Sequence, residues 1–535
     1  MRFTVPLLLQ SVCTILPCEL GSNVINQVQS YLESATSSIN TPPSTSTFSE
    51  SLQDTSSHAT KGHNVAIIGA GAAGSSAAFW IAKGKERLGA DINVDIYESK
   101  DYVGGRSTVV YPYGDTAYEP VELGASIFVK VNKNLMRASR EFNLSLFDFE
   151  DENEVSGVWD GEKFVVNLGG SGLGSWWRKL QIIRRYGWNS PKRTVDLVQG
   201  MVDSFVELYT NNPPKWRNIS EVSLQLDFTK FTVNTTSNYM EASEISRLWT
   251  HEVIEAATRV NYGQNADDIT ALGGTVSMAA SGASSVKGGN FQIFENFVSR
   301  SGANLFLNTP VTSVKKLKSN PPEWQVSTAS GESKIYNTVI IATPLTSSLE
   351  LIPSYAEASP EQKYVHLYVT LLTTTASHPS GDYFGTRSPP KSVLTTWEGV
   401  RNGGIEPEFN SLAYHGSPIE PEGKAKEWVV KIFSKKPLTN RLLRKLFNNE
   451  VGWIYRKEWD AYPVLYPRKE YPPVVLDKGL YHVNSFEPFI STMETETIAS
   501  RNIVDLIFEE NFGFGICGLE RTEDPSEDYV YGWDC

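Results

Sequence analysis

The chain has 535 residues, and its 48 Lys and Arg against 61 Asp and Glu give a formal net charge of −13. An acidic sequence without an evident basic cluster argues against nucleic acid and against anionic membrane surfaces as partners. Beyond the N-terminus there is no run of about 18 apolar residues, so we expect a soluble protein without a stable membrane span. The length leaves room for two interleaved domains with substantial cores.

The N-terminus carries a short apolar segment followed by a polar one. Arg2 precedes the run VPLLLQSVCTILP, which is too short to span a bilayer, and this pattern predicts a signal peptide over residues 1–20. A disordered or membrane-lying N-terminus is the alternative, because no clear cleavage site follows. Residues 21–61 are rich in Ser and Thr and poor in large apolar side chains, so we expect a disordered leader.

The folded body begins with a nucleotide-binding pattern. The apolar strand residues Val65 to Ile68 are followed by Gly69, Gly71 and Gly74 at the spacing G-x-G-x-x-G. Ala72 to Leu88 is predicted to be a helix, because small residues would let it pack closely on the sheet and cations crowd its far end. The order of strand, glycine turn and helix is the one that binds a dinucleotide.

An acid and a second glycine turn support the same prediction. Glu98 ends the next strand, about 20 residues beyond the glycines, where a carboxylate can accept hydrogen bonds from a ribose hydroxyl and disfavours a 2′-phosphate. Gly104 and Gly105 then precede Arg106, a cation able to neutralise a pyrophosphate. This arrangement resembles the flavoprotein amine oxidase superfamily, and the resemblance implies FAD as the cofactor.

A further glycine, Gly124, lies in an extended segment. Residues 119–131, EPVELGASIFVKV, are predicted to turn sharply at Gly124, where the backbone would come close to a bound group. Similar segments in the amine oxidase superfamily reach the flavin. We therefore include Gly124 among the expected cofactor residues.

Sequons and scarce cysteine indicate a secretory protein. The sequons begin at Asn143, Asn218 and Asn234. Two of the four cysteines lie in or near the predicted signal peptide, which leaves Cys517 and Cys535 either as a disulfide worth up to about 3 kcal/mol or as two free thiols. We expect the secretory pathway, ending in a vacuole or lysosome-like compartment or outside the cell.

From the middle of the chain onward the motifs resemble one family specifically, the prenylcysteine oxidases. The segments that carry the resemblance are RVNYGQ (259–264), VKGGN (286–290), VIIATP (339–344), WVVKIFS (428–434), WDAYP (459–463), YPPVVL (471–476) and LYHVNSFEPFISTMETETIASRNI (480–503). They occur in the order that the family shows. The resemblance covers residues 64–514 and leaves out the leader and the acidic tail.

The resemblance adds three cofactor residues. It implies that the backbone of Val311 meets the adenine, and that a turn through Glu487 followed by a helix capped near Thr492 contacts the pyrimidine side of the flavin. A helix N-terminus aimed at the flavin would stabilise negative charge on its reduced form.

The fold class that we expect is α/β, a Rossmann-type FAD-binding domain interleaved with an α+β substrate domain that carries an antiparallel sheet. The FAD-binding domain is expected in three parts, at residues 62–130, 291–350 and 476–514. A mainly helical segment over residues 131–290, together with residues 351–475, would form the substrate domain. Residues 515–535 would form an acidic tail.

The resemblance implies FAD-dependent oxidation of the thioether of farnesyl- or geranylgeranyl-cysteine, in the degradation of prenylated proteins. Hydride leaves C1 of the isoprenoid for the flavin, water adds, and prenyl aldehyde and free cysteine separate, while oxygen reoxidises the flavin and forms hydrogen peroxide. The cation is allylic and sulfur-stabilised, so the reaction needs no acid–base pair, and the sequence assigns neither a catalytic residue nor a metal ligand. The alternatives are oxidation of an amine or another lipophilic substrate, and a secreted protein that binds flavin or lipid without turnover.

A prenyl substrate, met as a free amphiphile, requires a hydrophobic tunnel. The candidate walls are four aromatic residues of the second domain, each of which is also explained as core: Trp176, Trp177, Trp453 and Trp459.

Overall fold

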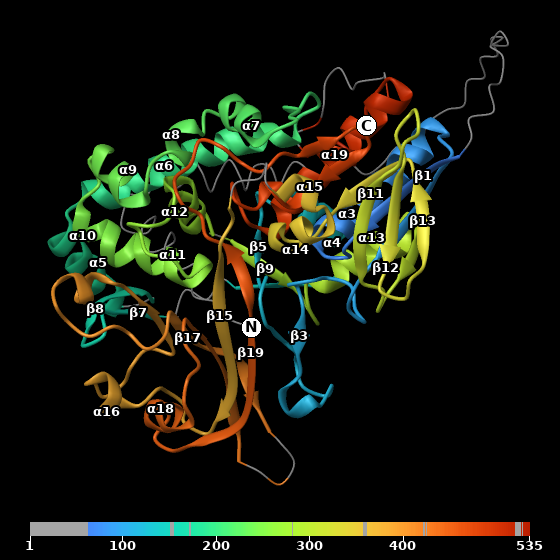
Figure 1. Ribbon diagram of the computed structural model, residues 1–535. Coiled ribbons are helices and arrows are strands. Elements are labelled where there is room, and N and C mark those ends of the chain that lie inside the picture. Colours follow the sequence, from blue (N-terminus) through green and yellow to red (C-terminus); the bar gives the residue numbers. More distant parts are fainter. Residues whose placement is uncertain are drawn as a thin grey trace, which may run out of the picture.

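The computed structural model describes residues 62–149, 155–170, 173–280, 282–356, 361–420, 423, 425–518, 526 and 528–535. The predicted signal peptide and leader lie outside these residues. In Figure 1, the elements around α3, α19 and β11 to β13 form one part of the molecule, and the helices α5 to α12 with the long strands β15 and β19 form the other.

The centre of the first part is a six-stranded sheet in the order β10-β2-β1-β14-β21-β20. Its strands are β10 (Asn304–Phe306), β2 (Ile92–Tyr97), β1 (His63–Ile68), β14 (Thr338–Ile341), β21 (Leu480–His482) and β20 (Val475–Asp477). The first five are parallel, and β20 is antiparallel to β21. Strands from distant parts of the sequence therefore share one sheet, and the predicted α/β class with a Rossmann-type domain is confirmed.

Both faces of this sheet are covered. On β1, Val65 and Ile67 pack with the helices, while Ala66 and Ile68 pack with a small antiparallel sheet, as expected when successive side chains of a strand point to opposite faces. The covering elements are the helices α3 (Ala72–Leu88), α13 (Phe291–Ser301) and α19 (Met493–Phe512), and the strands β11 (Val311–Lys316), β12 (Trp324–Thr328) and β13 (Ser333–Tyr336). The helix predicted from Ala72 to Leu88 is confirmed with the same bounds.

A seven-stranded sheet, in the order β19-β15-β18-β17-β16-β7-β8, is the centre of the second part. Its strands are β19 (Val451–Pro463), β15 (Tyr364–Thr374), β18 (Glu427–Ser434), β17 (Ser411–Ile419), β16 (Ser392–Thr395), β7 (Val155–Trp159) and β8 (Phe164–Gly169). All neighbours are antiparallel except β16 and β7. The predicted antiparallel sheet is present, and it also takes two strands from residues 131–290, where mainly helices were expected, because β7 and β8 are too short to give a clear alternating pattern.

Helices cover one end of this sheet, and we call them the helical layer. They are α5 (Leu173–Tyr186), α6 (Asn189–Phe205), α7 (Ile219–Gln225), α8 (Thr229–Thr232), α9 (Thr236–Ala242), α10 (Arg247–Trp249), a π-helical turn (Thr250–Ile254), α11 (Glu255–Tyr262) and α12 (Ala271–Met278). Val198, Met240 and Trp249 share a hydrophobic cluster with Leu394 of β16. In the part of the chain that the structure describes, no helix is both long and apolar enough to cross a bilayer.

Shorter elements complete the two parts. They are β3 (Val109–Val110), β4 (Val121–Glu122), β5 (Phe128–Val129), α4 (Lys133–Glu141), β6 (Leu146–Asp148), β9 (Ala283–Val286), α14 (Leu345–Leu351), α15 (Pro353–Ala356), α16 (Gly381–Phe384), α17 (Glu398–Arg401) and α18 (Asn440–Leu446). Among them, β5, β9 and β6 form a small sheet of their own.

The C-terminal segment, predicted as an acidic tail, packs against the first part of the molecule, where the C-terminus lies beside α19 (Figure 1). The Tyr531 hydroxyl donates to the Asp505 carboxylate (2.9 Å), and the Arg501 guanidinium donates to the Tyr531 carbonyl (3.0 Å). Cys517 and Cys535 are joined by a disulfide, with Cα atoms 5.1 Å apart. The structure therefore has a disulfide at these two positions and not two free thiols.

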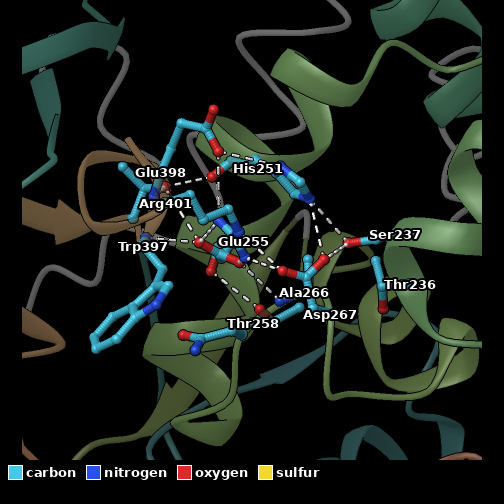
Figure 2. A network of polar contacts seen from close by, with 12 residues as sticks. Thr236, Ser237, His251, Glu255, Thr258, Ala266, Asp267, Trp397, Glu398 and Arg401 are labelled. Carbon is cyan, nitrogen blue, oxygen red and sulfur yellow. Dashed lines mark hydrogen bonds and ion pairs between the residues drawn. The ribbon is translucent and has the colours of Figure 1, made fainter. Parts of the chain in front are cut away.

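A buried charge network joins the helical layer to the seven-stranded sheet (Figure 2). Glu255, the first residue of α11, is fully buried, and its carboxylate accepts hydrogen bonds from both terminal nitrogens of Arg401 (2.9 and 2.5 Å). It also accepts from the backbone N–H groups of Ala266 (2.9 Å) and Trp397 (2.6 Å). These donors come from both the helical layer and the segment after β16, so one carboxylate fixes the start of α11 against the sheet.

The turn before α11 belongs to the same network. In Figure 2, His251 of the π-helical turn lies between two carboxylates, those of Asp267 (3.2 Å) and Glu398 (3.1 Å). The Ser237 hydroxyl donates to Asp267 (2.6 Å) and lies 3.1 Å from the His251 ring nitrogen. The contacts hold the turn and α11 in one position relative to α9 and α17.

We expect the change Glu255→Gln to lower the free energy of unfolding by about 3 kcal/mol, because it removes one partner of a buried, hydrogen-bonded ion pair. The matched change Glu141→Gln, at a half-exposed carboxylate that pairs with Arg137 (2.7 Å), should lower it by less than about 1 kcal/mol. Urea denaturation of both variants measures the difference. Equal losses would contradict the role of Glu255.

Candidate functional site

The first glycine turn brings α3 against the end of β1. Gly69 has a φ of 104°, and a Cβ atom on Gly74 would lie 1.9 Å from the carbonyl oxygen of Gly69. Gly71 differs from both, because a Cβ atom there would meet nothing closer than the Cα of Gly105, at 3.7 Å. Packing within the protein therefore requires glycine at positions 69 and 74. At Gly71 no protein atom occupies the position of a side chain, and this side of the residue faces a cavity.

Glu98 follows β2 and is held by the backbone around it. Its carboxylate accepts hydrogen bonds from the N–H groups of Ala70 (2.8 Å) and Lys100 (2.9 Å). The side chain is nearly buried but lines the cavity. Since an ionised carboxylate has about four acceptor positions, it keeps capacity for a ligand hydroxyl.

Arg106 is bound by a second acid from far along the chain. Its guanidinium forms an ion pair with Glu487, and it also donates to the carbonyl of Ala461 (3.0 Å). Glu487 accepts further hydrogen bonds from the Tyr364 hydroxyl (3.0 Å) and the Asn484 amide (2.9 Å). The prediction gave Arg106 a free charge for a pyrophosphate, whereas the structure shows a charge already balanced by Glu487.

Helix α19 begins at the same place. The Thr492 hydroxyl caps it by accepting from the N–H of Thr495 (3.1 Å). Both carboxylate oxygens of Glu496 and the Oδ1 of Asn484 are buried without a hydrogen-bond partner among the described residues, and both side chains line the cavity. Burial raises the pKa of Glu496. Unsatisfied buried polar atoms of this kind are expected where a polar group binds.

The cavity has a volume of about 700 Å³, and its lining consists of two chemically different groups of residues, which we call its polar end and its apolar end. The polar end contains the glycine turns, Glu98, Glu487 and the start of α19, at the carboxyl ends of the parallel strands, where α/β sheets bind ligands. The apolar end includes the polar residues Asn261 and Ser277 but consists mainly of apolar residues of the helical layer, of α4 and β5, and of the seven-stranded sheet: Phe128, Leu135, Met201, Phe205, Val260, Val276, Phe433 and Trp459.

Nine of the ten residues predicted to bind the cofactor line this one cavity. They are Gly69, Gly71, Glu98, Gly105, Arg106, Gly124, Val311, Glu487 and Thr492. The tenth, Gly74, lies behind the turn, where it permits the close packing of α3 on β1. The open side of Gly71, the available carboxylate of Glu98 and the unsatisfied atoms near α19 fit a bound dinucleotide.

Of the four aromatic residues that were candidates for the tunnel wall, most do not line the cavity. Trp176 and Trp177 lie on the outer face of α5, each 61 % exposed, and do not line the cavity. Trp453 lies on β19 and packs against a hydrophobic cluster that includes Leu367 and Phe433. It does not line the cavity, so only Trp459 of the four does. Helical or strand periodicity indicates that a side chain belongs to a face, but it does not indicate which face meets a cavity.

Several residues that line the cavity could not be identified from the sequence. Asn484 and Glu496 gave no signal, because a polar side chain near a helix start is ordinarily exposed. Met201 and Phe205 were visible only as part of the apolar face of a helix, which predicts core packing equally well.

Comparisons with known proteins agree with this architecture. The family profile described as prenylcysteine lyase matches residues 173–512, and a profile described as NAD(P)-binding Rossmann-like domain matches residues 67–142. The chain is 29 % identical to farnesylcysteine lyase of Arabidopsis thaliana over 460 residues, covering 83 % of this chain and 87 % of the relative. It is 27 % identical to prenylcysteine oxidase 1 of Homo sapiens over 467 residues, covering 83 % and 88 %.

Solved structures share the fold at low sequence identity. Cyclohexylamine oxidase from Brevibacterium oxydans superposes with a TM-score of 0.52 at 14 % identity, covering 84 % of this chain and 99 % of the other. A fatty acid isomerase from P. acnes superposes with a TM-score of 0.55 at 12 % identity, with the same coverage of 84 % and 99 %. The family profile spans more than half of the sequence, and the chain therefore belongs to the prenylcysteine lyase family.

Proposed function

We propose that this protein is an FAD-dependent oxidase that cleaves the thioether of prenylcysteine, giving a prenyl aldehyde, free cysteine and hydrogen peroxide. The observation that carries the proposal is the single cavity in which the dinucleotide residues open directly onto an apolar wall. Relatives named farnesylcysteine lyase and prenylcysteine oxidase 1, each matched over 83 % of this chain, support it.

FAD would be held by the glycine turns, with Glu98 at a ribose hydroxyl and the capped start of α19 near the flavin. Bound FAD supplies a two-electron acceptor for the hydride of the prenyl C1 atom and passes the electrons to oxygen. The positive end of α19 would stabilise negative charge that develops at its N-terminus. Arg106 would help to position the residues around the cofactor more than it would neutralise the cofactor's charge, because Glu487 already balances its own charge.

The substrate side of the cavity would bind the prenyl chain and exclude bulk water. Met201, Phe205 and Val260 come from α6 and α11, and Trp459 from β19, so the wall is built where the helical layer meets the sheet. An allylic carbon next to sulfur forms a stabilised cation when it loses hydride. The residues therefore need to orient C1 and to admit one water molecule, and no acid–base pair is required.

We also propose that the protein enters the secretory route and ends in a vacuole or lysosome-like compartment or outside the cell. The disulfide between Cys517 and Cys535 supports this, since structural disulfides persist in oxidising compartments. Asn143 and Asn218 are exposed, as glycosylation requires, although the Asn218 amide also donates to Glu221 (2.7 Å) at the start of α7.

Gly71→Val should abolish FAD binding without unfolding the protein, because the open side of Gly71 faces the cavity and the nearest protein atom is 3.7 Å away. FAD released per polypeptide on denaturation measures binding, and circular dichroism measures folding. Gly200→Val is the control, since a Cβ atom at this α6 position meets nothing within 4 Å. A folded Gly71→Val protein with stoichiometric FAD would contradict the cofactor assignment.

Turnover should require an allylic C1 and should improve with prenyl length. We expect geranyl-, farnesyl- and geranylgeranyl-cysteine to yield peroxide and aldehyde, and KM to fall with length, because each buried methylene-sized group contributes about 0.8 kcal/mol. S-hexadecyl-cysteine, which has a saturated C1, should bind without turnover. Equal oxidation of the hexadecyl compound, or peroxide from benzylamine alone, would reject the thioether mechanism in favour of amine oxidation.

An endoglycosidase should increase the gel mobility of the protein isolated from its own cells, and Asn143→Gln should remove one glycan from the untreated protein. Asn143 is exposed at a positive φ of 54°, on a turn accessible to a glycosyltransferase. Mass spectrometry of the N-terminus gives an independent check. A protein that begins at Met1 and does not change mobility would contradict the secretory proposal.

A further inference from the structure

Helix α5 presents apolar side chains to solvent. Trp176 and Trp177 are each 61 % exposed and Leu180 is 43 % exposed, while Trp188, just after the helix, is 37 % exposed. The opposite side of α5 is ordinary core, where Ile182 and Tyr186 are buried in the hydrophobic cluster of the helical layer. We call the outer side, defined by Trp176, Trp177, Leu180, Arg184 and Trp188, the tryptophan face.

This face is unusual within the molecule. The other large apolar side chains exposed among the described residues are dispersed over three separate elements and one loop: Leu224, Phe306, Ile335 and Ile405. Scattered exposed apolar residues are normal, whereas several on one helix face indicate an interaction site. The two adjacent indoles also pack edge to face, with ring centroids 4.9 Å apart, so the face presents a continuous aromatic surface.

The sequence that contains the tryptophan face is locally basic, in contrast to the chain as a whole. Residues 163–195 contain seven Lys and Arg and no Asp or Glu, in a chain of net charge −13. Some of these cations have partners, as Arg185 does in Glu252. Lys179 and Arg184 form no ion pair with any residue that the structure describes. The acidic balance of the whole chain therefore does not extend to this stretch of the sequence.

Aromatic side chains beside unpaired cations match the chemistry of a lipid–water interface. Tryptophan is enriched at the level of the lipid headgroups, and amphipathic helices with Lys or Arg beside an apolar face lie in the plane of anionic membranes. With 14 residues, α5 is about 21 Å long, which is too short to span a bilayer but suits a helix that lies flat.

We propose that the tryptophan face docks this protein onto anionic lipid bilayers, with Trp176, Trp177 and Leu180 inserted among the acyl chains and Lys179 and Arg184 at the lipid headgroups. The helix that follows, α6, lines the apolar end of the cavity with Met201 and Phe205. The docking face and the cavity wall thus belong to consecutive helices. Docking concerns the surface of the protein and stands independently of the reaction in the cavity.

The test is sedimentation of the full-length protein with phosphatidylcholine vesicles that contain or lack phosphatidylserine. We expect binding to the anionic vesicles, reduced at least tenfold by W176A/W177A and weakened by high salt. K179Q/R184Q should remove the preference for phosphatidylserine. The control L224A/I405A deletes two equally exposed apolar side chains elsewhere, 73 % and 61 % exposed, and should bind like the wild type.

Three results would overturn the proposal. The first is absence of wild-type binding to anionic vesicles, and the second is equal binding by W176A/W177A and the control. The third is a concentration-dependent dimer that W176A/W177A abolishes, since the face would then be a contact between two copies of the chain. None of these readouts depends on turnover, so a failure of the proposed oxidase activity would leave the vesicle result interpretable. Near-wild-type FAD content in W176A/W177A confirms that the variant is folded.

Discussion

The end of β1, the start of α3 and the second glycine turn approach one another at the carboxyl edge of the six-stranded sheet, and no side chain lies between them. Gly69 and Gly74 allow α3 to start directly against β1, and Gly71 forms a bridge with Gly104 of the second turn. A Cβ atom on Gly105 would lie 3.1 Å from the Cα of Gly71, so the two turns contact each other through backbone alone. At the two glycine turns this contact leaves backbone, and not side chains, facing the cavity.

The apolar end depends on a different part of the chain. It forms where α6, α11 and α12 meet the seven-stranded sheet, and the position of α11 is fixed by the buried carboxylate of Glu255. Two separately stabilised units therefore build one cavity, a dinucleotide end and a lipophilic end. Cyclohexylamine oxidase shares this overall fold, and a shared fold does not by itself fix the substrate, which has to be inferred from the cavity of this chain.

The sequence predicted what is encoded locally. The glycine spacing, the helix from Ala72 to Leu88 and Glu98 follow from adjacent residues, and the structure has them as expected. Arg106 lies at the cavity as expected, but its ion pair with Glu487 was not predicted, because the two residues are 381 positions apart. Trp176 and Trp177 were candidates for the tunnel wall or for the core and lie on the surface, since periodicity identifies faces but not their neighbours. The basic region around α5 was hidden by a charge count over the whole chain.

If FAD and prenylcysteine react within one cavity, the substrate must reduce the flavin itself. The decisive measurement is to add farnesylcysteine to the purified protein under anaerobic conditions and to record the visible flavin absorbance. We expect the absorbance to bleach with one equivalent of substrate and to return when oxygen is admitted. Bleaching with amines but not with farnesylcysteine, or no bleaching with either, would contradict it.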